Sequence, residues 1–327
     1  MILGGIHAIT NKFISGWAGD TRSNEPVTVE LLLDGVVINT TAAVQEVGAP
    51  DLNDGRCGWR FGMRDIWQLI RSGQALTVRV ADGPPLRTWR GKQRIPIGGP
   101  EPADGSDTLL DLISAGLVVD KFGRAIRPVD ARQAWQRRVT DGFALLRREL
   151  EDTFGYTPFL TYGMLLGYAR QRAPITADHD CDVTYLSDRG EPDKVRVEFE
   201  QIVEHLVAID DNRTVYPYKI VWHGRFSITP SWICPDGMRM TFGYVSDDAH
   251  VGRDDIFPLQ EVQMGLMRLL VPRNAERVAE FIYGPGWRYP DSGWVWRTKW
   301  KTRPEQLAAR LNPATVDRLN ETASPPT

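Results

Sequence analysis

The stretch TYGMLLGYARQRAPITADHDCDVTYL, residues 161–186, decides the fold and the chemistry expected of this chain. Asp178, Asp180 and Asp182 alternate within it. Residues i, i+2 and i+4 of a β-strand point to one face, so a strand over residues 175–183 would stack three carboxylates. Buried like charges repel, and a divalent cation with oxygen ligands relieves that repulsion and can hold a phosphate. The stretch therefore predicts a metal site that acts on a phosphate ester.

Two other interpretations of the aspartates need weighing. A calcium loop of the EF-hand type requires glycine at its sixth position and glutamate at its twelfth. Counted from Asp178, those positions hold Val183 and Arg189, so the sequence excludes that loop. A solvated acidic loop stays open on charge alone. The small residues before the aspartates and the apolar residues after them favour a strand.

The context of the aspartates resembles the LicD family, which includes bacterial phosphocholine transferases and fukutin-type proteins. That family carries a Gly-Thr-Leu-Leu-Gly turn, an arginine after it, and a strand similar to Ile-Pro-Trp-Asp-Asp-Asp-Ile-Asp. The matching residues are Gly163-Met164-Leu165-Leu166-Gly167, Arg170 and residues 175–183. A second block in the family's order comprises Asp255-Ile256-Phe257-Pro258-Leu259, Val271-Pro272-Arg273-Asn274 and Tyr283-Gly284-Pro285-Gly286-Trp287. Together the blocks span residues 140–291, about half of the chain.

The resemblance implies a nucleotidyltransferase-like fold, a mixed sheet with flanking helices, whose glycine turn and aspartate strand form the site. The residues it assigns to nucleotide and phosphate binding are Gly163, Met164, Leu165, Gly167 and Arg170. The residues it assigns to catalysis are Asp178, Asp180 and Asp182, of which Asp180 and Asp182 hold Mg²⁺ or Mn²⁺. Glycines also let a backbone approach a phosphate closely. Neither a Walker A motif nor a GxGxxG follows an expected strand, so P-loop and Rossmann folds have no support.

The implied reaction transfers a phosphoalcohol group from a CDP-activated donor to a hydroxyl of a cell-surface glycan and releases CMP. Phosphocholine, ribitol phosphate and glycerol phosphate are groups of that type. The expected partners are therefore a CDP-linked donor and a glycan acceptor. Two alternatives stay open: nucleotidyl or sugar-phosphate transfer at the same site, and a non-catalytic glycan-binding protein with a degenerate second domain. The sequence does not specify the alcohol, the glycan or the oligomeric state.

The chain departs from the family pattern in three places. Thr176-Ala177 replaces Pro-Trp before the first aspartate, and His179 replaces an acidic residue. The further aspartate that the family carries on a later strand has no counterpart in residues 238–244, where we expect that strand. The general base is therefore unassigned, and the candidate substitutes are Asp236, Asp247, Asp248, Asp254 and Asp255.

Composition and charge are those of a globular protein and do not indicate a membrane-spanning or nucleic-acid-binding one. A chain of 327 residues with a net charge of −3 fits two globular domains and gives no indication of a nucleic-acid partner. No signal peptide is visible, and no stretch approaches the roughly 18 apolar residues of a membrane span. Its three cysteines are far apart, which indicates reduced thiols. These features predict a cytoplasmic protein, and peripheral attachment to a membrane is left open.

The first 90 residues predict an antiparallel β-sandwich accessory module. Asp34-Gly35 between apolar stretches is a hairpin signal, and residues 76–80 alternate as a half-buried strand. Gly16-Trp17-Ala18 and residues 56–61 resemble a module appended to bacterial polysaccharide glycosyltransferases. Packing in the core is favoured over a sugar-stacking platform for three aromatic residues, Trp17, Trp59 and Trp67.

The rest of the chain completes an α+β architecture. Residues 91–130 predict a linker and docking segment, because residues 91–107 are rich in glycine, proline and charge. Residues 131–312 are the expected catalytic domain, and residues 313–327 a tail. Apolar spacing predicts helices over residues 135–154 and 195–209, and a third helix is expected between caps at Asn274 and Gly284. The tryptophan- and cation-rich residues 287–301 are expected both to pack the sheet and to place one or two cations near the site.

Overall fold

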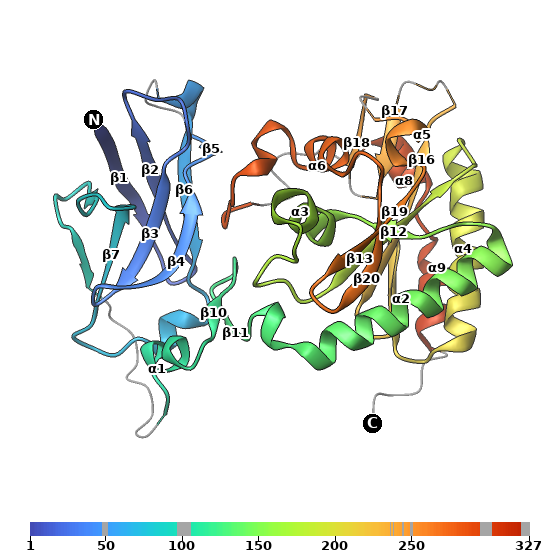
Figure 1. The fold of residues 1–327 in the computed structure, drawn as a ribbon, viewed down its shortest axis with the longest axis horizontal. Helices are drawn as coiled ribbons and strands as arrows, with labels where there is room; N and C mark the ends of the chain where they lie inside the picture. Colours follow the sequence, from blue (N-terminus) through green and yellow to red (C-terminus); the bar gives the residue numbers. More distant parts are fainter. Residues whose placement is uncertain are drawn as a thin grey trace. The chain divides into compact units, whose positions relative to one another are not determined.

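The computed structural model describes residues 1–47, 52–96, 106–235, 237, 239–243, 245–248, 251–294 and 303–321. They form the helices and sheets of an α+β protein, as the sequence predicts (Figure 1). The chain divides into two compact units. The first unit is Met1–Ala131 with Arg288–Val295, and the second is Arg132–Trp287 with Trp296–Thr327.

Two sheets build the first unit, with strand orders β5-β6-β2-β1-β8 and β4-β3-β7-β9. Neighbouring strands are antiparallel except for β1 and β8. The strands are β1 (Ile2–Ile9), β2 (Phe13–Asp20), β3 (Thr28–Leu33), β4 (Val36–Ala42), β5 (Gln45–Glu46), β6 (Arg56–Gly62), β7 (Ala75–Val80), β8 (Arg87–Thr88) and β9 (Arg94–Pro96). Two 3₁₀ turns, η1 (Asn53–Gly55) and η2 (Ile66–Leu69), flank β6.

A single hydrophobic core joins the two sheets of the first unit. Ile14 and Phe61 from one sheet and Leu31 and Val78 from the other belong to the same cluster of buried residues. The β3–β4 hairpin turns at Asp34-Gly35, where both residues have positive φ, and this confirms the hairpin signal. Apolar side chains from both sheets are therefore buried in one core.

The segment expected to be a linker is largely part of the first unit. β9 pairs with β7, and residues 106–131 add further elements to the same unit. These elements are α1 (Leu109–Ser114), β10 (Val118–Val119), β11 (Ala125–Ile126) and η3 (Val129–Ala131). Leu109 and Val119 are in the core cluster, so burial of apolar side chains overrides the linker-like composition. Residues 97–105, the centre of the predicted linker, lie outside the described residues.

A mixed sheet of order β12-β13-β16-β15-β14 forms the second unit, with β17 paired to β16 and β18 to β17. β13 and β16 are parallel, and the other pairs are antiparallel. The strands are β12 (Phe159–Leu160), β13 (Cys181–Ser187), β14 (Arg213–Tyr216), β15 (Lys219–Trp222), β16 (Phe226–Ile233), β17 (Arg239–Phe242) and β18 (Val245–Asp248). A separate hairpin contains β19 (Gln260–Met264) and β20 (Met267–Val271).

The second unit contains the two helices that apolar spacing predicts, at Gln133–Phe154 and Pro192–Ile209, together with further helices. They are α2 (Gln133–Phe154), α3 (Tyr162–Gln171), α4 (Pro192–Ile209), α5 (Arg253–Ile256), α6 (Ala275–Tyr283), η4 (Pro285–Arg288), α8 (Pro304–Ala308) and α9 (Pro313–Glu321). Gly155 ends α2 in the left-handed conformation, and α6 lies between Asn274 and Gly284 as expected. Figure 1 shows α3 and α6 on one side of the sheet and α4 on the other.

Two segments depart from the predicted domain limits. Residues 288–294 belong to the first unit: Ala42 N donates to the Pro290 carbonyl at 2.7 Å, and Ser292 Oγ donates to the Arg60 carbonyl at 2.6 Å. The expected tail begins with α9, where Asn320 Oδ1 accepts from Val215 N at 2.9 Å. Both departures depend on hydrogen bonds between residues far apart in the sequence, which no local pattern encodes.

Candidate active site

The aspartate segment does not form the predicted strand over residues 175–183. β13 begins at Cys181, so Asp182 lies in the strand while Asp178 and Asp180 lie in the loop before it. The loop arises because Asp178 N donates to the Ile175 carbonyl at 2.9 Å, which closes a turn, and pairing with the neighbouring strand starts only at Cys181. The three carboxylates therefore do not stack along one strand face.

The aspartate loop, residues 178–180, gathers ligand atoms in a different way. One carboxylate oxygen each from Asp178 and Asp180 and one imidazole nitrogen of His179 lie within 4.8 Å of one another. In a strand, His179 would point away from its neighbours, and only a loop lets it turn toward them. The sequence marks His179 only as a departure from the family pattern and does not indicate that its imidazole lies beside the two carboxylates. The group of candidate ligand atoms therefore spans residues 178–180, and the expected metal pair of Asp180 and Asp182 stays a prediction.

Two contacts hold the aspartate loop in place. Arg132, which precedes α2, donates from Nη2 to the Asp178 carbonyl. Burial lowers the pKa of Arg132, and the negative charge of Asp178 opposes that change. A Cβ at Gly163 would lie 2.8 Å from Asp178 Oδ2, so glycine leaves the space that this carboxylate occupies.

Asp182 faces the opposite side of β13 from Cys181 and Tyr185, toward the start of α3. The Gly163 N–H donates to its carboxylate, at a helix N-terminus that favours negative charge. Burial raises the pKa of Asp182 to about 7, the charge of Asp180 adds to the rise, and Lys219 opposes it. A partly buried carboxylate beside a second one is an arrangement that a bound cation stabilises.

Residues 163–167 lie in the first turns of α3 and do not form the expected glycine turn. The side chains of Met164 and Leu165 are fully buried, so only their backbone is left to face a ligand. Gly167 packs against the incoming chain, because a Cβ there would lie 2.7 Å from the Ala173 carbonyl oxygen. The glycines therefore serve packing of the segment that leads into the aspartate loop.

Arg170 is engaged with the second family-like block. Its Nε donates to the Trp287 carbonyl at 2.5 Å, which ties α3 to the chain that follows α6. Burial raises the pKa of Tyr283, the charges of Asp182 and Asp178 raise it further, and Arg170 opposes them. The tertiary structure thus brings Tyr283, from the end of α6, close to the aspartates that the first block supplies.

Two of the candidate general bases, Asp255 and Asp247, are engaged with other residues in the described structure. Asp255 accepts from Gly252 N at 3.0 Å and Asn274 Nδ2 at 2.7 Å, so it joins α5 to α6. Asp247 forms an ion pair with Arg303 at 3.6 Å. Asp248 and Asp254 are exposed, and Asp236 lies outside the described residues. The residue of β16 paired with Asp182 is Ser227, so that register position supplies no carboxylate.

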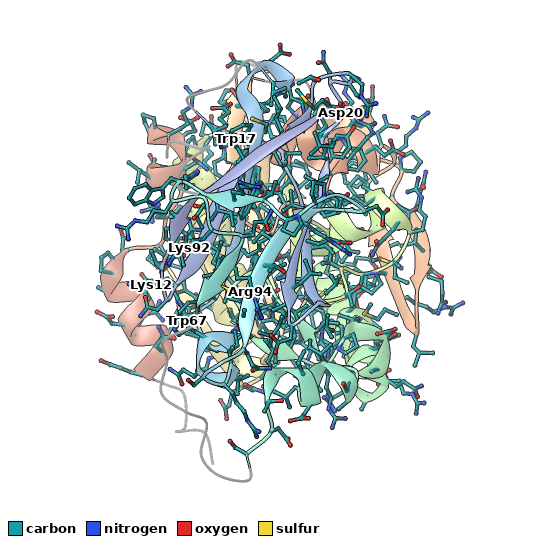
Figure 2. All side chains as sticks on the ribbon, turned by 90° about the vertical axis from the view of Figure 1, so that its left-hand side faces the viewer. Lys12, Trp17, Asp20, Trp67, Lys92 and Arg94 are labelled. Atoms are coloured by element: carbon teal, nitrogen blue, oxygen red, sulfur yellow. The ribbon has the colours of Figure 1, made fainter. Side chains whose placement is uncertain are left out.

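The tryptophans of the first unit do not form one sugar-stacking platform. Trp59 is 1% exposed and belongs to the core, and Trp67 packs against the same core. Figure 2 shows Trp17 and Trp67 well apart on the unit. Of the tryptophan-rich end, Trp287 is buried in the second unit and Trp294 belongs to the first. Outside the described residues lie Trp296, Arg297, Lys299, Trp300 and Lys301.

No helix in the described part of the chain is both long and apolar enough to cross a membrane. No family model matches the chain, and a search of curated proteins found no matching sequence. The resemblance to the LicD family therefore rests on the sequence motifs alone.

Proposed function

We propose that this protein is a metal-dependent phosphotransferase of the LicD type. It would transfer a phosphoalcohol group from a CDP-linked donor to a glycan hydroxyl and release CMP. The second unit would be the nucleotidyltransferase-like catalytic domain, and the first a β-sandwich accessory module. The observation that carries the proposal is the group of ligand atoms from residues 178–180 within 4.8 Å of one another, next to the partly buried Asp182.

The donor set of the aspartate loop fits a divalent cation. Carboxylate oxygens from Asp178 and Asp180 suit Mg²⁺ or Mn²⁺, and the imidazole of His179 favours the transition ion. Asp182 would complete the acidic surface from the strand. When bound, the ion would neutralise charge on the phosphate oxygens of the donor.

The remaining residues of the site would position the reactants. The Arg132 side chain holds the aspartate loop by donating to the backbone carbonyl of Asp178. The Gly163 N–H fixes the Asp182 carboxylate. Phosphoryl transfer needs little covalent chemistry from the protein and depends on positioning and electrostatic stabilisation. An aspartate loop held by Arg132 therefore suits this reaction.

A thermal-shift experiment tests the proposal. CDP, CMP, UDP, GDP and ADP would each be added with and without Mn²⁺ to the wild type and to Asp180→Asn. The control is Asp317→Asn, an exposed position on α9 of the same unit. A ligand at about 100 times its Kd stabilises by roughly 2.7 kcal/mol, a rise of several degrees in Tm.

We expect stabilisation by cytidine nucleotides that requires metal, disappears in Asp180→Asn and persists in Asp317→Asn. If none of the nucleotides raises the Tm, the proposal is contradicted and the glycan-binding alternative is favoured. The first unit would then be tested against glycans.

A further inference from the structure

Helix α2 and strand β16 approach each other closely at Gly142. A Cβ there would lie 2.6 Å from Cε2 of Phe226, so a larger residue does not fit without movement. Arg138 is four residues before Gly142, on the same face of α2, and Arg225 directly precedes Phe226. The close packing of the helix on the strand therefore brings the backbones of Arg138 and Arg225 near each other in the second unit.

These two arginines have no acidic partner among the described residues. Among the described residues no ion pair within 4.0 Å involves Arg138 or Arg225, whereas Arg147, Arg148 and Arg213 each have one. Arg225 Nε donates to the His223 carbonyl at 3.2 Å, and its buried Nη1 has no hydrogen-bond partner. Asp210, an acid near this turn, is engaged with Nδ1 of His223.

Two neighbouring cations without an anion are electrostatically unfavourable. Burial lowers the pKa of Arg225, and the charge of Arg138 lowers it further. An oxyanion resolves the repulsion and supplies an acceptor for the buried Nη1, because guanidinium groups bind phosphate oxygens with charge-assisted hydrogen bonds. Arg138 is exposed, so a ligand can reach the pair from solvent.

The backbone of Arg225 lies next to the end of the aspartate loop. Cys181 N donates to the Arg225 carbonyl at 2.9 Å, one residue after Asp180. Arg132, at the start of the same helix that carries Arg138, anchors the aspartate loop. Binding at the arginine pair would therefore occur close to where that loop joins the sheet.

We propose that Arg138 and Arg225 form an anion site that binds a phosphate group. The site is distinct from the glycine segment and Arg170, which were expected to bind phosphate. That the phosphate belongs to a substrate, either the CDP-linked donor or the glycan acceptor, rests on the proposed function. The presence of the anion site does not depend on the proposed function.

Binding of inorganic phosphate in the presence of EDTA tests the site directly. Titration calorimetry and thermal shift would compare the wild type with Arg138→Gln, Arg225→Gln and the double variant. The matched control is Arg137→Gln, because Arg137 is the exposed neighbour on α2 and has no ion pair in the described chain. Charge-assisted hydrogen bonds lead us to expect roughly a tenfold or greater loss of phosphate affinity in each site variant. Arg137→Gln should bind as the wild type does.

Stability without phosphate gives a second readout. If the arginines repel each other, the Tm of Arg138→Gln in phosphate-free buffer should equal or exceed that of the wild type. A lower Tm would show that Arg138 has an acidic partner and would overturn the site. Equal phosphate binding by the wild type and the double variant would also overturn it, as would the absence of phosphate binding by the wild type.

Two further measurements separate this inference from the proposed function. Asp180→Asn should keep phosphate binding in EDTA, since the anion site needs no metal. If nucleotides do not bind but phosphate binding still depends on Arg225, only the proposed function fails. If CDP affinity falls in Arg225→Gln, the phosphate belongs to the donor. If CDP affinity is unchanged while phosphate affinity falls, it belongs to the acceptor.

Discussion

The carboxylate of Asp178 occupies the space that a side chain at Gly163 would fill. A Cβ on Gly163 would lie 2.8 Å from Oδ2 of Asp178. The same glycine donates its N–H to the carboxylate of Asp182. One small residue at the start of α3 thus positions two acidic groups, one from the aspartate loop and one from the strand.

Gly163→Ala should displace Asp178 and weaken metal binding at the aspartate loop. We expect the Mn²⁺ affinity to fall by about tenfold while the Tm changes little. The atom that a Cβ on Gly163 would meet is the far end of the Asp178 side chain, which can move aside, and the roughly 1 kcal/mol higher helix propensity of alanine offsets the remaining strain. Calorimetric titration with Mn²⁺ measures the effect. Gly286→Ala is the control, because a Cβ there meets no atom within 4 Å. Unchanged Mn²⁺ affinity in Gly163→Ala would show that Asp178 does not bind the metal.

His179→Ala should reduce Mn²⁺ affinity more than Mg²⁺ affinity. An imidazole nitrogen is a better ligand for a transition ion than for Mg²⁺, whereas the carboxylates of Asp178 and Asp180 serve both. We expect a loss of about tenfold for Mn²⁺, comparable to the removal of a metal-orienting group. Paired titrations with the two ions check this. Equal losses for both ions would indicate that His179 acts only through the shape of the loop.

The stability of the metal-free protein should fall as pH rises from about 4 to about 7. The pKa of Asp182 is about 7 in the folded protein, against an ordinary value of 3.8. Between those values the folded state retains a proton that the unfolded chain has released, so the free energy of unfolding decreases with pH. A shift of this size corresponds to at most about 4 kcal/mol.

Urea unfolding of wild type and Asp182→Asn in EDTA at pH 5 and pH 8 would measure this pH dependence. The amide does not titrate. The free energy of unfolding of Asp182→Asn relative to that of the wild type should therefore be higher at pH 8 than at pH 5. Mn²⁺ at pH 8 should stabilise the wild type. Parallel pH profiles for the two proteins would rule out a raised pKa at Asp182.

Gly142→Ala should destabilise the second unit although it lies inside a helix. Alanine in a helix interior normally stabilises by roughly 1 kcal/mol relative to glycine. Here the added Cβ would lie 2.6 Å from the ring of Phe226, and overpacking of that kind costs about 1–3 kcal/mol. Chemical denaturation gives the free energy directly. A stabilised Gly142→Ala would mean that α2 and β16 do not pack as closely as the structure shows.

Local sequence patterns were sufficient for the features that depend on neighbours along the chain. The spacing of Val139, Phe143, Leu146 and Leu150 placed α2, because a helix with that repeat buries one face. Asp34-Gly35 placed a hairpin because both positions need positive φ. Gly155 and Gly284 ended helices for a related reason, since glycine allows positive φ at a helix end.

The amino-acid sequence by itself determined the α+β class, the positions of the long helices and the presence of an acidic cluster after α3. Only the tertiary structure decided how that cluster is shaped. Pairing of β13 with β16 begins at Cys181, which leaves Asp178 and Asp180 in a loop and turns His179 toward them. The packing of α2 on β16 and the return of residues 288–294 to the first unit were decided in the same way. Local periodicity reports which face of an element is buried, whereas strand register and long-range contacts depend on partners distant in the sequence.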